Sequence, residues 1–260
     1  MGLRINQNVA AYNAHRNLSV TNGQLAKSLE KLSSGFRINR AADDAAGLAI
    51  SEGLRSQVGG LKVASRNAQD AVSVLQTAEG ALTEVHAMLQ RMNDLAVQYN
   101  SGIVEEGSDS ATALESEFDA LKEEIGRITS NTKFNGVALF EDGTLTFQVG
   151  YDSEDTIDVD LAALDVEDAV ISDSTTVQTA INTVSTARAD FGALQNRFEH
   201  VINNLSVAIE NLSAAESRIR DTDMAAEMVS FTRAQILAQA GTAMLAQANQ
   251  VPQGVLQLLR

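Results

Sequence analysis

The most regular hydrophobic pattern in the chain runs from residue 177 to residue 215. Apolar residues recur there at alternating spacings of three and four: Val177, Ala180, Val184, Ala187, Phe191, Leu194, Phe198, Val201, Leu205, Ala208, Leu212 and Ala215. This spacing is typical of helices that pack side by side as a coiled coil. We therefore predict one long helix over this segment. Its predicted core positions are Phe191, Leu194, Phe198 and Leu205.

A second long helix is predicted for residues 44–99, because every seventh position is apolar: Leu54, Leu61, Ala68, Leu75, Leu82, Leu89 and Ala96. A further apolar stripe from Val74 to Tyr99 indicates that this helix has two neighbours. Asp43 or Asp44 fits the N-terminal cap, and Asn100-Ser101-Gly102 is a natural stop. The helix would be roughly 84 Å long at 1.5 Å per residue. Its predicted core positions are Leu54, Leu61, Leu75 and Leu82.

The segment between the two long helices combines a shorter helix with a β-hairpin. The shorter helix is indicated by apolar residues in helical spacing: Leu114, Phe118, Leu121, Ile125 and Ile128. Thr112 and Glu115 fit a capping box before it. Apolar residues then alternate with polar ones over 145–149 and 157–161, on either side of Gly150-Tyr151-Asp152-Ser153. This pattern predicts a hairpin within residues 137–161, with acidic residues on its outer face.

Both ends of the chain are also predicted to be helical arms. The N-terminal arm carries an apolar stripe that includes Ile5, Val9, Leu25 and Leu32, and Gly35 stands where a helix-ending glycine is expected. The C-terminal arm carries no charged side chain from Ala234 to Leu259. Its apolar positions include Met228, Phe231, Leu237, Leu245, Val251 and Leu256.

These elements predict a mainly α fold, an elongated antiparallel helical bundle or coiled-coil rod with a small β-hairpin region. A compact globule of this length would have a diameter of roughly 45–50 Å, so it cannot contain a helix of roughly 84 Å. A single neighbouring helix is not enough to bury the apolar faces of each arm. We therefore expect the arms to become ordered when they associate with other copies or other proteins. Such a chain is suited to be the subunit of a polymer.

Composition and charge exclude several classes of function. The net charge of -15 argues against binding to nucleic acid or to an anionic membrane. Residues 101–180 hold 19 acidic and 3 basic side chains, which we interpret as a solvated surface. The chain has no Cys and only three widely separated His. It also lacks an HExxH motif and any Ser, His and Asp motif of known catalytic type. We therefore expect no metal, no cofactor and no enzymatic activity.

Several segments closely resemble bacterial flagellins. The N-terminal segments are LSSGFRINRAADDAAGLAIS (32–51), QTAEGAL (76–82), LQRMNDLAVQ (89–98) and NTKFNG (131–136). The C-terminal segments are RIRDTDMAAEM (218–228) and QANQVPQGVLQLL (247–259). The resemblance covers residues 1–150 and 177–260. It implies a structural subunit of the flagellar filament, exported unfolded through the flagellar type III channel and extracellular once assembled, with a hook–filament junction protein as the alternative.

The resemblance also implies a division of the chain and a set of partners. Residues 1–43 and 217–260 would form the arms of the inner tube (D0), and residues 44–216 the surrounding rod (D1), with no separate outer domain. The implied partners are other flagellin subunits, the flagellar cap, hook-junction proteins, an export chaperone and the host's Toll-like receptor 5. By motif, the receptor contact maps to Arg91, Leu95 and Glu117. Many members of the family carry Arg where this chain has Asn93, so a lower affinity is expected.

Overall fold

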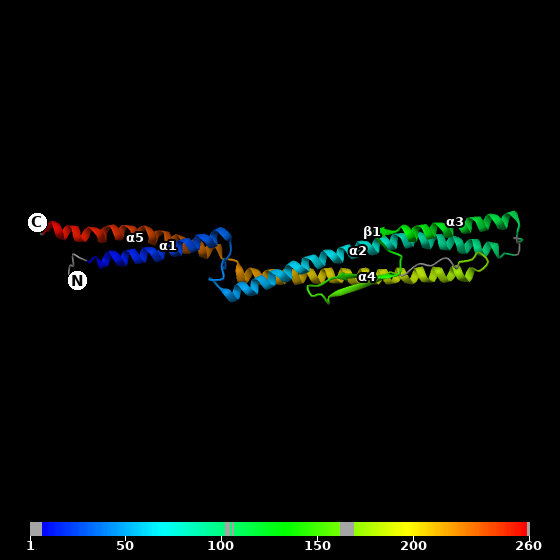
Figure 1. The fold of residues 1–260 in the computed structure, drawn as a ribbon, viewed down its shortest axis with the longest axis horizontal. Helices are drawn as coiled ribbons and strands as arrows, with labels where there is room; N and C mark the ends of the chain where they lie inside the picture. The colour runs from blue at the N-terminus through cyan, green and yellow to red at the C-terminus, as the bar shows by residue number, and fades with distance from the viewer. Residues whose placement is uncertain (1–6, 102–104, 106, 162–168, 259–260) are drawn as a thin grey trace. The chain divides into compact units, whose positions relative to one another are not determined.

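The computed structural model describes residues 7–101, 105, 107–161 and 169–258, with side chains described up to residue 250. Within these residues the chain is mainly helical, with two short antiparallel strand pairs (Figure 1). The helices are α1 (Val9–Ser34), α2 (Ala45–Tyr99), α3 (Asp109–Asn131), α4 (Ser174–Arg220) and α5 (Met224–Leu258). The strands are β1 (Lys133–Phe134), β2 (Val137–Ala138), β3 (Gly143–Gln148) and β4 (Thr156–Leu161). The predicted fold class, mainly α with a small hairpin region, is confirmed.

The contacts within the chain divide it into two compact units. The first unit comprises Met1–Ser56 and Leu212–Arg260, and the second comprises Gln57–Asn211. The sequence places the boundaries differently, at 43/44 and 216/217. Because α2 and α4 each contribute residues to both units, neither boundary falls at the end of a helix.

In the first unit, α1 and α5 pack against each other in antiparallel directions. The Nδ2 of Asn8 donates a hydrogen bond to the carbonyl oxygen of Ala248 over 2.7 Å. At the other end, Lys31 Nζ lies 3.7 Å from an oxygen of Glu227. Between them, Gly241 permits a close approach, because a Cβ at this position would lie 3.2 Å from Leu18 Cδ1. The two arms predicted from opposite ends of the sequence therefore pair with each other.

In the second unit, α2 supplies the largest share of the buried core. Ala68, Leu82, Val85, Leu89 and Leu95 are almost entirely shielded from solvent. The core is completed from α3 by Phe118 and Ile125, and from α4 by Val177, Val184, Phe191 and Phe198. Because α3 and α4 both pack on α2, the two apolar stripes in its sequence each have a neighbour.

The β3–β4 hairpin lies against the helices of the second unit and continues its core. Leu145 pairs with Val159 and Phe147 with Ile157. The ring of Phe147 meets the ring of Phe198 edge to face, with 5.9 Å between their centroids. Asn67 Nδ2 also donates a hydrogen bond to the carbonyl oxygen of Gln148 over 3.0 Å, which attaches the hairpin to α2.

Several predicted helix ends are confirmed by their hydrogen bonds. Gly35 ends α1 with φ of 76°, in the left-handed region that glycine occupies without strain. Asp44 accepts a hydrogen bond from the backbone N–H of Gly47 over 2.8 Å and so caps the start of α2. The last residue of α2 is Tyr99, immediately before the predicted stop.

The structure differs from the sequence-based expectations in three details. The cap of α3 is Ser108 rather than Thr112, because Ser108 accepts from the N–H of Ala111 while the Thr112 hydroxyl donates to the Ser108 carbonyl inside the helix. The helix predicted over residues 177–215 extends further, since α4 continues to Arg220 and only residues 221–223 separate it from α5. The pairing of β1 with β2 was not predicted, although Asn135 and Gly136 both have positive φ and form its tight turn.

Candidate assembly surfaces

The paired helices α1 and α5 leave many apolar side chains exposed along their length. On α1, Tyr12 is 74% exposed, and Val9, Val20 and Leu29 are exposed as well. On α5 the exposed apolar side chains are Met224, Met228, Val229, Ile236, Leu237 and Met244. We call these α1 and α5 residues the arm surface. Burial of apolar area is the main favourable term in protein association, and exposed apolar patches mark interaction sites.

The arm positions singled out from the sequence differ in their exposure. Val9, Met228 and Leu237 are exposed and belong to the arm surface. The half-buried positions are Leu25, Leu32, Phe231 and Leu245. Ile5 and the side chains of Val251 and Leu256 lie outside the described residues.

The sequence pattern does not identify every residue of the arm surface. Val229, Ile236 and Met244 are exposed, yet no periodic signal sets them apart from their neighbours. The reason lies in the composition of α5, which carries apolar residues around most of its circumference. Periodicity separates a buried face from an open face only when the open face is polar.

The two breaks between the arms and the long helices meet in a junction inside the first unit. The N–H of Arg37 donates to the carbonyl oxygen of Arg220 over 2.7 Å, and the N–H of Thr222 donates to that of Gly35 over 3.0 Å. The Arg220 guanidinium lies 4.8 Å from the centroid of the Phe36 ring and pairs with Glu52 at 2.5 Å. The two breaks therefore face each other and are joined by these backbone hydrogen bonds and by one from the Arg37 side chain to the carbonyl oxygen of Ile219 over 2.6 Å.

In the segment between α1 and α2, the carboxylate of Asp43 holds a tight turn by accepting backbone hydrogen bonds. Asp43 accepts hydrogen bonds from the backbone N–H groups of Arg40, over 3.0 Å, and Asn39, over 3.3 Å. The bond from Arg40 is the main reason that the pKa of Asp43 lies below its ordinary value, and the bond from Asn39 adds to it. The turn is therefore held by a carboxylate that stays ionised, directly before Asp44 caps α2.

The predicted core positions of the rod lie in different surroundings. Leu75, Leu82, Phe191 and Phe198 are buried in the core of the second unit. Leu205 is also buried, whereas Leu61 and Leu194 are half-buried. Leu54 is half-buried and belongs to the first unit.

The structure brings together two of the three predicted receptor-contact residues on an exposed face of α2 and α3. Arg91 Nη2 lies 2.7 Å from Glu117 Oε1, and both side chains are about half exposed. Leu95, one helical turn after Arg91, is fully buried in the core. A partner that docks on this face therefore meets the ion pair, while Leu95 supports the helix from inside.

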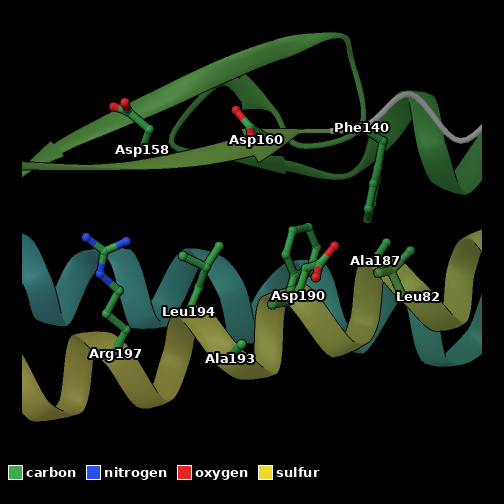
Figure 2. A pocket seen from close by; sticks show the side chains of 10 residues that line it. Leu82, Phe140, Asp158, Asp160, Ala187, Asp190, Ala193, Leu194 and Arg197 are labelled. Carbon is green, nitrogen blue, oxygen red and sulfur yellow. The ribbon is translucent and has the colours of Figure 1, made fainter.

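A groove runs between β4 and α4 in the second unit (Figure 2). Its apolar lining includes Leu82, Phe140, Phe191 and Leu194, and its volume is about 470 Å³. The charged residues that line it are Asp158 and Asp160 on β4 and Asp190 and Arg197 on α4. The groove is therefore apolar inside and predominantly acidic at its charged positions.

The described part of the chain offers little for metal or membrane chemistry. Among the described residues, no three or more His, Cys, Asp or Glu side chains are placed to share a metal ion. No described helix has both the length and the apolar character needed to cross a bilayer. His86, placed in α2, is engaged by a neighbour in its own helix, with its Nε2 3.0 Å from Gln90 Nε2.

Family models and curated relatives match this chain over most of its length. A family model for the bacterial flagellin N-terminal helical region matches residues 5–144, and one for the C-terminal helical region matches residues 174–259. A flagellin of Halalkalibacterium halodurans is 54% identical over 98% of this chain and 99% of its own length. A flagellin of Bacillus subtilis is 47% identical over 99% of this chain and 100% of its own. A crystal structure of Bacillus cereus flagellin aligns with a TM-score of 0.49 and 31% identity, covering 58% of this chain and 94% of that one.

Proposed function

The chain belongs to the bacterial flagellin family and is a structural subunit of the extracellular flagellar filament, and we propose that its two terminal arms drive assembly of that filament. Residues 1–43 and 217–260 would form the inner tube, and residues 44–216 the layer around it. The observation that carries this proposal is the arm surface, whose apolar side chains α1 and α5 do not bury between themselves. Motility is the biological output of such a filament.

The arm surface leaves apolar area exposed to water, and this area favours assembly. Burial contributes about 25 cal/mol for each Å² of apolar surface removed from water. Each exposed side chain such as Tyr12, Ile236 or Met244 therefore adds a favourable increment when a second copy covers it. A helical filament repeats the same contact along its length, so each subunit gains this increment on more than one side.

Removal of residues 251–260 tests the assignment of the arms. The shortened chain should keep its helical circular dichroism, because the core of the second unit lies within residues 68–198. It should fail to polymerise, because the end of α5 is lost. Polymerisation would be followed by light scattering and electron microscopy, with the full chain as control. Filaments from the shortened chain would contradict the proposal.

A filament subunit implies further partners that belong to this proposal. We expect the chain to contact the flagellar cap and hook-junction proteins at the two ends of the filament, and an export chaperone before secretion. The matches at 54% and 47% identity favour a filament subunit over a hook–filament junction protein. The family is structural, and we propose that the chain has no enzymatic activity, which a protease assay on assembled filaments would test.

We also propose that the face carrying Arg91 and Glu117 is recognised by Toll-like receptor 5. Both side chains are accessible, and their ion pair fixes the direction of the guanidinium. Asn93 stands where many family members carry Arg, so we expect a lower affinity for the receptor.

Arg91→Ala in the monomer should greatly weaken receptor activation in a cell reporter assay, because the exposed cation is lost. Arg127→Ala is a matched control, since Arg127 is also exposed and also pairs with a Glu, Glu124 on α3. Wild-type monomer should activate the receptor. Inert wild-type monomer, or full activity of Arg91→Ala, would show that this chain lacks the site.

A further inference from the structure

The groove between β4 and α4 has an apolar lining and, among the described residues, unpaired charges, as expected of a surface that another protein covers. Its inner surface is apolar, with Leu82, Phe140 and Phe191 among its lining residues. A second hollow continues it along the same two elements, and the two share Ala193 and Arg197. The continuous groove therefore follows α4 from Ala187 to Leu205 and is open along its length.

The charges of the groove are not neutralised within the chain. Among the described residues, Asp158, Asp160 and Asp190 form no ion pair, and Asp160 accepts only a hydrogen bond from Thr144 Oγ1 over 3.1 Å. Arg197 is the one cation among the residues lining the first hollow. Three carboxylates against one guanidinium leave a local excess of negative charge, which favours a cationic partner.

A complementary surface lies on α2 of the same unit. Lys62 and Arg66 are exposed and form no ion pair with any residue that the structure describes. They are four residues apart in the helix and so share one face. Val63, which is 45% exposed, adjoins them as an apolar knob, and Gly59 one turn earlier leaves the backbone open to close approach. We call Gly59, Lys62, Val63 and Arg66 the α2 patch.

The spacing of the two sets of charges agrees. Residues four apart on a helix face lie about 6 Å apart. Residues two apart on one face of a strand, as Asp158 and Asp160 are, lie roughly 6.5–7 Å apart. One carboxylate of β4 is therefore available to each cation of the patch, while Val63 faces the apolar lining.

We propose that the groove between β4 and α4 binds the α2 patch of a second copy of this chain, with Lys62 and Arg66 opposite Asp158 and Asp160. This inference rests on the proposed function, because assembly is what supplies the second copy. It adds a charge-specific contact between the second units of two subunits. The apolar arms give such copies affinity, and the charged contact sets the register in which they meet.

Charge reversal of each side tests the contact. Lys62→Glu with Arg66→Glu, and separately Asp158→Lys with Asp160→Lys, should each raise the critical concentration for polymerisation at least about tenfold, because like charges would then face each other. The chain carrying all four substitutions should polymerise close to the wild-type concentration, because its reversed patch fits its reversed groove. Asp119→Lys with Glu123→Lys on α3 is the control for charge change alone, and it should leave polymerisation unaffected.

The outcomes separate this inference from the function on which it rests. Wild-type polymerisation by both charge-reversed pairs would overturn the inference while leaving the role of the arms intact. Failure of the fourfold variant to recover would also overturn it. Filaments from the chain lacking residues 251–260 would instead contradict the arm proposal. If a reversed pair does not fold by circular dichroism, Lys62→Gln with Arg66→Gln replaces it, and an unchanged salt dependence of elongation would overturn the inference.

Discussion

At the scale of single residues, the core of the second unit contains a few large aromatic rings. Only 4% of the chain is aromatic, and it has no Trp. Phe118, Phe191 and Phe198 nevertheless lie in the centre of the second unit. Phe198 is fully buried and also contacts the ring of Phe147 on β3. One side chain of α4 therefore joins the helices to the hairpin.

Phe198→Ala should destabilise the second unit by roughly 3–5 kcal/mol, because it removes a large buried side chain and leaves a cavity. Urea unfolding of the monomer, followed by circular dichroism, measures the change. Val207→Ala on the same helix is the control, since Val207 is 58% exposed and its loss should have little effect. Equal stability of Phe198→Ala and wild type would mean that this stripe does not face the core.

At the scale of elements, the turn of the hairpin is tightly packed around Gly150, whereas α4 has free space at Gly192. A Cβ at Gly150 would overlap the side chain of Asp155, whose carbonyl closes the turn by accepting from Val149 N–H over 2.9 Å. Gly192 lies inside α4 with open space where a Cβ would stand. The same substitution should therefore have opposite effects at the two positions.

Gly150→Ala should destabilise the hairpin by about 1–3 kcal/mol, because the turn must open to admit the methyl group. Gly192→Ala should stabilise the protein by about 0.5–1 kcal/mol, because alanine loses less backbone entropy in a helix. Thermal unfolding of the two monomeric variants measures both effects. The same sign of change in both would show that local crowding does not govern these positions.

At the scale of the whole molecule, the two compact units differ in how their elements are buried. The main core cluster lies entirely between Ala68 and Phe198, within the second unit. The first unit is chiefly a helix pair with an exposed apolar surface. Regions with few buried apolar contacts open at lower free energy than a packed core, so the first unit should open more readily in the monomer.

Limited digestion of the monomer with trypsin should cut the first unit before the second. Arg16, Lys27 and Arg233 lie in the arms, while Arg91 and Arg188 lie in the second unit. Mass spectrometry of an early time point should show a resistant fragment containing the core of the second unit. Assembled filaments provide the comparison, because neighbouring copies should protect the arms. Equal cutting rates in both units of the monomer would contradict the expected difference.

The helices and the family could be predicted from the sequence because they depend on local order along the chain. Phe191 and Phe198 recur at the heptad spacing of a helix that packs. Asp44 and Gly35 mark helix ends through hydrogen bonds and dihedral angles that involve only near neighbours. The family follows from segments such as residues 32–51, which are contiguous in the sequence.

The groove, the junction and the open face of α5 were decided by the tertiary structure. Asp158 and Arg197 line one groove only because the hairpin lies beside α4. Arg37 and Arg220 are 183 positions apart, and the fold brings the N–H of the first to the carbonyl oxygen of the second. Leu95 lies both on the second apolar stripe of α2 and at a receptor-contact position by motif, and the structure places it fully buried in the core. Periodicity predicts that the apolar face of a helix is buried. Which element covers that face is decided by contacts between residues far apart in the chain.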